Sequence, residues 1–163
     1  MLGLLLAAIL FNLIAFKTNK RLTKNQIIHI WTFTLTFQLL FDCIIDIKYS
    51  GYWYFTTEFD WFEMPARLVL IPPVNMIFLN YFPFKKAFIR KIYYLFGWDV
   101  MLILYELITL LPEPYGYFYY GWWSLWYSLI INPLLLICLL NYYKWIYQVE
   151  MKSESGCPAA SGK

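Results

Sequence analysis

Residues 38–84 read QLLFDCIIDIKYSGYWYFTTEFDWFEMPARLVLIPPVNMIFLNYFPF, and they hold two carboxylates, an aromatic loop and a proline-interrupted apolar segment in succession. Asp42 and Asp46 are four residues apart near the end of an apolar run, so on a helix they share one face, which Gln38 and Thr34 extend. A carboxylate at bilayer depth costs roughly 2.5 to 3.5 kcal/mol, so it normally pairs with a partner or lines a cavity. These two acids are therefore the first candidates for a functional site.

The composition of the 163-residue chain is that of an integral membrane protein. Hydrophobic residues make up 61% of the chain and charged residues only 14%, whereas soluble domains are about 45 to 50% apolar. A membrane span needs about 20 residues, so the length allows one compact bundle and no separate soluble domain. The basic residues stand in short connections between apolar runs, where they report topology and do not indicate a nucleic-acid partner.

The three cysteines and the single histidine do not predict a metal or redox site. Cys43 and Cys138 lie inside apolar segments, and Cys157 lies in a Ser/Gly/Ala-rich stretch, so we expect no disulfide framework. His29 begins its span at the membrane face opposite Cys43, which argues against a catalytic His/Cys pair. The sequence identifies no cofactor.

Five apolar segments predict an all-α, polytopic membrane fold with five transmembrane helices. They cover residues 1–16, about 27–47, 65–82, 92–111 and 123–143. Eleven Lys and Arg residues fall on one side of this arrangement and only Lys48 and Arg67 on the other. The positive-inside rule then places the N-terminus outside and the C-terminus inside.

We expect one membrane domain over residues 1–147, followed by a flexible cytoplasmic tail over residues 148–163. The tail has no apolar periodicity in its final stretch, KSESGCPAASGK. The two outer loops, YSGYWYFTTEFDWF and PEPYGYFYYGWW, are crowded with Tyr and Trp, which prefer the headgroup region. These loops are expected to lie flat on the outer surface.

The second and third spans resemble the fourth and fifth. Phe41-Asp42 corresponds to Tyr105-Glu106, and the loop sequence that begins at Gly51 corresponds to the one that begins at Gly116. Farther along, Pro72 and Pro133 are each followed eight residues later by an asparagine and two aromatic residues. This pattern indicates a parallel repeat related by an axis along the membrane normal, an arrangement in which sites form at the repeat interface.

Polar residues within the spans are the candidates for binding a ligand or an ion. By a count from the outer ends of the spans, Asp42 and Glu106 lie roughly 7 Å below the outer boundary, and Asp46 and Arg67 lie near it. Asn75, Asp99 and Asn132 lie at roughly mid-membrane by the same count. The candidates are Asp42, Asp46, Arg67, Asn75, Asp99, Glu106 and Asn132.

Two interpretations of these residues stay open. One is a cation or proton site that opens outward, with Arg67 tuning the acids. The other is an ion cluster that only locks the bundle together.

Near mid-membrane, Pro72 and Pro73 deprive the carbonyls of Leu68 and Val69 of their helical donors. Those carbonyls could coordinate a cation, or neighbouring helices or water could satisfy them.

The stretches Asp46-Ile-Lys-Tyr, Tyr52-Trp-Tyr-Phe, LIPPVNMIFLNYFPF and GWWSLWYSLIINPLLLICLLN carry a family resemblance. The chain resembles a family of uncharacterised small multi-pass membrane proteins of spore-forming Gram-positive bacteria. This resemblance implies a helical protein of the bacterial plasma membrane that is linked to sporulation, and it supplies no catalytic residues. The tryptophan-rich sensory proteins have a similar length, but their Trp-x-Pro-Pro signature is absent from the sequence.

Three hypotheses for function follow from the sequence. The first is a non-enzymatic membrane protein that binds or passes a small cation, proton or solute, or a subunit of a membrane assembly that does so. The second is a membrane-embedded enzyme that acts on a lipid or isoprenoid, with Asp42 and Asp46 holding Mg²⁺. The third is a structural or assembly protein. Expected partners are membrane lipid and either further copies of the chain or another membrane protein.

Overall fold

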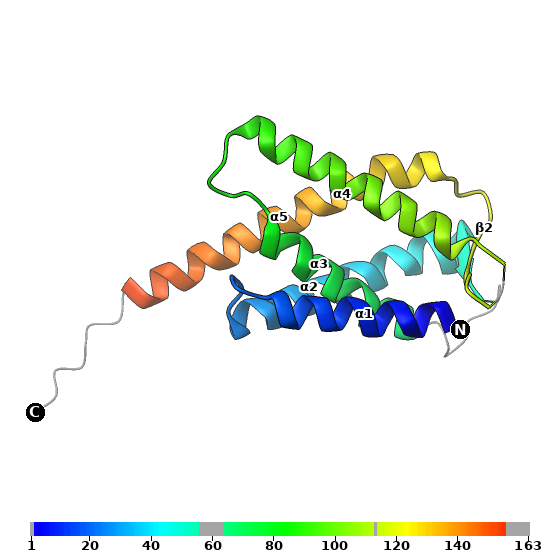
Figure 1. Cartoon of the computed structure of the whole chain (residues 1–163), viewed down its shortest axis with the longest axis horizontal. Helices are drawn as coiled ribbons and strands as arrows, with labels where there is room; N and C mark the ends of the chain where they lie inside the picture. The colour runs from blue at the N-terminus through cyan, green and yellow to red at the C-terminus, as the bar shows by residue number, and fades with distance from the viewer. Residues whose placement is uncertain (1, 56–63, 113, 156–163) are drawn as a thin grey trace, which may run out of the picture.

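The computed structural model describes residues 2–55, 64–112 and 114–155, and within these ranges the side chains of residues 42, 43, 66, 154 and 155 lie outside the description. The described part is mostly helical, with a small two-stranded sheet at one end (Figure 1). Its helices are α1 (Leu2–Thr18), α2 (Lys24–Asp42), the π-helix η1 (Cys43–Lys48), the π-helix η3 (Ala66–Leu70), α3 (Ile71–Tyr81), α4 (Phe88–Thr109) and α5 (Leu125–Ser155). Its strands are β1 (Tyr52–Tyr54) and β2 (Phe118–Tyr120).

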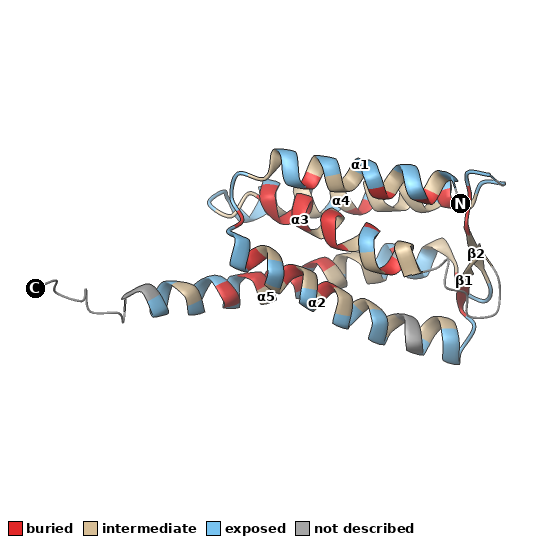
Figure 2. Cartoon of the chain, turned by 90° about the horizontal axis from the view of Figure 1, so that it is seen from below, coloured by how far each residue is buried: buried red, intermediate tan, exposed pale blue. Residues whose placement is uncertain are grey.

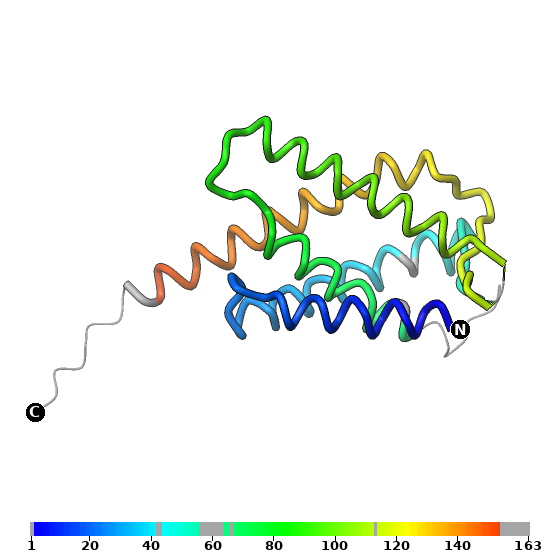
Figure 3. Tube along the Cα trace, in the orientation of Figure 1, coloured from blue at the N-terminus to red at the C-terminus, as the bar shows by residue number. Residues whose placement is uncertain are grey.

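Successive helical segments run in alternate directions along the long axis of the molecule, as the chain trace shows (Figure 3). The N-terminus of α1, the end of η1, the end of α4 and the sheet lie at one end, which we call the ribbon end (Figure 1). The short connections α1–α2 and α3–α4 lie at the opposite end, which we call the basic end because it carries most of the lysines and arginines. The predicted segregation of the basic residues is therefore present in the fold.

Three helical segments are long and apolar enough to cross a membrane: residues 24–48, 88–109 and 125–153. Large apolar side chains cover the outer faces of these and of α1; Ile9, Leu13 and Ile130, for example, are 59%, 62% and 64% exposed. Such a surface suits lipid, because a helix that is apolar all round needs an apolar environment. The chain is thus compatible with a multi-pass membrane protein.

Helix α3 is the most buried element of the bundle (Figure 2). It packs against α1, α2 and α5, and Phe78 and Leu79 in its second half are fully buried. Pro72 and Pro73 occupy its first turn, the part of an α-helix where proline is best tolerated. This explains why the regular α-helix begins there, after a wider π-helical turn.

The main apolar core lies in the half of the bundle toward the basic end. It includes Ile30 from α2, Met76 from α3, and Leu136 and Leu139 from α5. A smaller cluster near the ribbon end joins Leu4, Leu70 and Tyr117. Close packing is therefore concentrated in one half of the bundle, while the other half also holds a cavity.

The two aromatic loops were expected to lie flat at the membrane surface, and the structure shows that their described parts are not two separate loops. Instead β1 and β2 pair as an antiparallel ribbon, with Trp53 opposite Tyr119 and Tyr54 opposite Phe118. Backbone bonds extend the pairing, because the N–H groups of Gly121 and Trp123 both donate to the carbonyl of Gly51. The aromatic side chains thus pack against one another across the end of the bundle. Residues 56–63 and 113 of these loops lie outside the described residues.

The last helix is longer than the sequence predicted. We expected a span ending near Tyr143 and a flexible tail from residue 148, but α5 continues to Ser155. Gln26 and Asn25 from α2 hold Glu150 in this extension through hydrogen bonds of 2.5 and 2.6 Å. These bonds fix α5 beyond the predicted span. Residues 156–163 lie outside the described residues.

Candidate functional site

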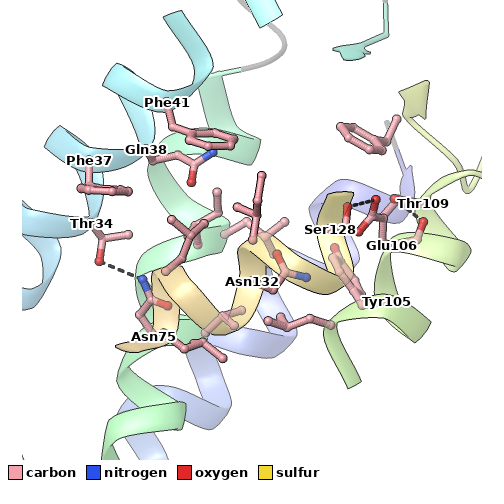
Figure 4. A pocket seen from close by; sticks show the side chains of 18 of the residues that line it. Thr34, Phe37, Gln38, Phe41, Asn75, Tyr105, Glu106, Thr109, Ser128 and Asn132 are labelled. Carbon is pink, nitrogen blue, oxygen red and sulfur yellow. Dashed lines mark hydrogen bonds between the residues drawn. The ribbon is translucent and has the colours of Figure 1, made fainter. Parts of the chain in front are cut away.

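A cavity of about 260 Å³ lies between α2, α3, α4 and α5, beneath the β-ribbon. Figure 4 shows its polar side chains spread from Thr34 and Asn75 at one wall to Glu106 at the other, with Asn132 between them. Engineered cavities of about 150 Å³ already bind benzene. The space is therefore large enough for a small organic molecule.

Aromatic side chains form much of the cavity wall. They come from α2, the ribbon, the α4–α5 connection and α4, and they are Phe33, Phe37, Phe41, Tyr52, Tyr54, Tyr105, Tyr117, Phe118 and Trp123. Most of the remaining wall is aliphatic. A largely apolar cleft with a few converging polar groups is the usual composition of a small-molecule site.

Glu106 is the acidic residue of the cavity wall, and neutral donors hold its carboxylate. Its Oε1 atom accepts hydrogen bonds from the Tyr120 hydroxyl at 2.5 Å and from the Ser128 hydroxyl at 2.7 Å. Ser128 in turn accepts a bond from the Trp123 indole N–H at 2.9 Å. The ribbon, α4 and α5 therefore meet at this one carboxylate.

The loop tyrosines of this network keep their protons to high pH. Burial raises the pKa of Tyr120, and its hydrogen bond to Glu106 raises that pKa further. Burial also raises the pKa of Tyr117, whose hydroxyl lies 2.7 Å from that of Tyr105. Both phenols thus remain neutral hydrogen-bonding groups across the physiological range.

The mid-membrane residues fall into two groups. Asn75 donates to the Thr34 hydroxyl at 3.0 Å and links α3 to α2. Asn132 hydrogen-bonds Asp99, a buried residue whose Oδ1 atom has no hydrogen-bond partner in the described part of the chain. Asp99 also repels Glu106, which lies two turns farther along α4. The predicted acidic face of this helix is therefore present, although Asp99 itself lies behind the cavity wall.

Asp46 and Arg67 meet as the depth count predicted, and they form a salt bridge between η1 and η3. Arg67 is only 2% exposed, and its guanidinium lies 5.1 Å from the ring centroid of Tyr54, a residue of the cavity wall. Asp46 is thus matched by a cation of the chain itself. Asp42 ends α2, but its side chain lies outside the described part.

The carbonyl that Pro73 frees is satisfied within the bundle. The Asn12 side chain of α1 donates to the carbonyl of Val69 at 2.9 Å. The neighbouring-helix interpretation therefore holds for this carbonyl. Among the residues that the structure describes, no group of three or more His, Cys, Asp or Glu side chains could hold a metal ion.

The cavity brings together three of the seven predicted site residues, Asn75, Glu106 and Asn132. Sequence reasoning missed Ser128 and Tyr120, which hold the Glu106 carboxylate. A signal for Ser128 was present, because Ser124, Ser128 and Asn132 recur every four residues, as on the polar face of α2. Nothing in the local sequence distinguishes Tyr120 from its aromatic neighbours.

Comparison of the chain with protein-family models, with curated proteins and with solved structures found no match. The family resemblance therefore stays a prediction.

Proposed function

We propose that the chain is a non-enzymatic integral membrane protein that binds a small organic cation in the central cavity. The observation that carries this proposal is the charge of the cavity wall. Glu106 is the one Asp or Glu among its described residues, and no Lys, Arg or His lines it. A carboxylate in an apolar cavity without a basic partner favours a cationic ligand, because an opposite charge offsets its desolvation.

The aromatic wall supports the same ligand class. Rings of Phe, Tyr and Trp attract a cation over their faces by about 0.5 to 2 kcal/mol each, and aromatic cages recognise quaternary ammonium groups in this way. An inorganic cation would need several oxygen ligands gathered around one point, whereas the polar side chains of the wall are spread from Thr34 and Asn75 to Glu106 (Figure 4). An ammonium ion that carries an apolar group can use both the carboxylate and the rings.

Equilibrium binding to the purified protein in lipid nanodiscs tests the proposal, with benzyltrimethylammonium as the probe. Glu106→Gln should weaken binding about tenfold or more, since a charged partner in a desolvated site contributes at least about 1.5 kcal/mol. Glu150→Gln is the matched control, because Glu150 lies at the basic end and does not line the cavity. Equal binding by the wild type and Glu106→Gln would overturn the proposal.

For the membrane arrangement, we propose five spans with the N-terminus outside and the C-terminus inside a bacterial plasma membrane. The alternating helix directions and the clustering of basic residues at one end support it. Segments α1 and η3–α3 have 17 and 16 residues, so they cross a core of about 30 Å only with local thinning or help from their neighbours. Cysteine labelling should find residues 17–25 and 83–91 inside, and labelling of 83–91 from outside would contradict this topology.

We also propose that α2–α3 and α4–α5 are two copies of one hairpin around an axis through the ribbon. The supporting observation is that the two corresponding loop segments pair with each other in β1 and β2. Gly51 and Gly116 begin these segments, and an added Cβ would collide with neighbouring atoms at either position. The cavity then lies between the two copies, where repeat proteins commonly place their sites.

A further inference from the structure

A second pocket, of about 830 Å³, lies at the basic end and shares no residue with the central cavity. The α3–α4 connection forms one side through Lys85 and Lys86, and α5 forms another through Tyr143, Lys144 and Tyr147. Arg21 from the α1–α2 connection completes the charged lining. Three segments that are distant in sequence thus bring four basic side chains to one pocket.

The structure holds Arg21 firmly in this position. Its Nη1 atom donates to the carbonyls of Phe82 at 2.6 Å and Leu79 at 3.1 Å, at the C-terminal end of α3. Its guanidinium also lies 5.1 Å from the ring centroid of Phe84. The fold therefore fixes one of the four positive charges at the pocket.

The pocket has no acidic residue in its described lining. None of its four basic side chains forms a salt bridge with another described residue. The acid on the adjoining part of α5 is Glu150, which Asn25 and Gln26 engage outside the pocket. Four positive charges thus converge on a space that no described acidic side chain lines.

We propose that this pocket binds the phosphate headgroup of an anionic phospholipid, such as phosphatidylglycerol. Lys and Arg gathered in a pocket between membrane helices attract anionic headgroups. The tyrosines suit the same depth, because their rings are apolar and their hydroxyls are polar. The proposal is independent of the cation site, and the proposed topology places the lipid in the inner leaflet.

The test measures lipid retention by native mass spectrometry after purification from mixed phosphatidylglycerol and phosphatidylcholine micelles. The pocket variant is Lys85→Gln/Lys86→Gln/Lys144→Gln. The control variant, Lys17→Gln/Lys24→Gln/Lys91→Gln, removes the same charge from the same end outside the pocket lining. The wild type and the control should prefer phosphatidylglycerol alike, and the pocket variant should lose about tenfold of that preference.

Three results would overturn the proposal. Equal losses in both triple variants would mean that only the overall surface charge attracts the lipid. An unchanged preference in the pocket variant would mean that the lipid binds elsewhere. Displacement of phosphatidylglycerol by millimolar inorganic phosphate would assign the pocket to a soluble phosphate compound. If the triple variant does not fold, Lys144→Gln alone should reduce the preference about threefold, and no change would count against the lipid site.

Discussion

Asp46 and Glu106 both lie toward the ribbon end of the bundle, but their carboxylates have different partners. Asp46 is paired with the buried cation Arg67. Glu106 is held by the neutral hydroxyls of Tyr120 and Ser128 beside an open cavity. A carboxylate paired with a buried cation has its charge matched within the fold, whereas one held by neutral donors can still bind an external cation. We therefore propose a structural role for the first acid and a binding role for the second.

The largest effect is expected from breaking the ion pair. Arg67→Met should lower the free energy of unfolding by about 3 to 5 kcal/mol, because it leaves Asp46 with an unmatched charge. The double variant Arg67→Met/Asp46→Asn should recover part of this loss, since it removes the unmatched charge as well. Denaturant unfolding in detergent micelles provides the measurement. A double variant no more stable than Arg67→Met would show that Asp46 does not depend on this pair.

The next largest effect concerns the ribbon that brings Tyr120 to Glu106. A Cβ added at Gly116 would lie 1.6 Å from the carbonyl oxygen of Leu111, which cannot move without shifting the backbone. Gly116→Ala should therefore lower the free energy of unfolding by about 1 to 3 kcal/mol, and it should weaken cation binding at the same time.

Gly97→Ala is the matched control for this change, because a Cβ there meets nothing within 4 Å. It should be neutral or slightly stabilising, since alanine is favoured over glycine inside a helix. Similar unfolding curves for the two alanine variants would mean that the ribbon does not hold the end of the bundle.

A smaller effect would test whether the two copies of the hairpin share one acidic site. The proposed repeat would make Asp42 and Glu106 equivalent, so the effects of Asp42→Asn and Glu106→Gln should not be additive. Their coupling free energy should be at least about 0.5 kcal/mol if the two acids interact. A double-mutant cycle on thermal stability measures it. Strict additivity would leave Glu106 as the only acid of the cavity.

The smallest effect is a pH dependence of the Glu106 network. Burial raises the pKa values of Tyr117 and Tyr120 above the ordinary value of 10.0. Their contribution to stability is therefore fully present below pH 10 and is lost as the pH rises above it, because the unfolded phenols ionise first. Tyrosinate absorbance followed together with unfolding should show part of the tyrosines ionising late and with loss of structure. Ionisation of all tyrosines near pH 10 in the folded protein would contradict this.

Much of the helical arrangement could be predicted from the sequence, since long apolar runs and the placement of basic residues are local signals. The approach of Asp46 and Arg67 was also predictable, because both lie near the same ends of adjacent spans. The point at which α5 ends could not be predicted, because hydrogen bonds from Asn25 and Gln26 of α2 hold Glu150 in its last turns. Contacts between distant residues leave no mark on local periodicity.

The ribbon and the cavity could not be predicted for a related reason. Tyr and Trp suit both the membrane interface and a packed strand pair, so the aromatic loops were interpreted only as interfacial anchors. Pairing of β1 with β2 joins segments more than sixty residues apart. The ribbon covers the space between the helices, so neither Trp123 of the cavity wall nor Tyr120, which donates to Glu106, could be assigned to the site from sequence.

The central claim is that Glu106 makes the cavity selective for a positive charge. The direct measurement compares benzyltrimethylammonium with neopentylbenzene, a neutral molecule of nearly the same shape, in the wild type and in Glu106→Gln. The wild type should prefer the cation about tenfold or more, after correction for partition into lipid, and Glu106→Gln should lose this preference. An equal preference in the two proteins, or a wild type that binds the neutral molecule as well as the cation, would contradict the claim.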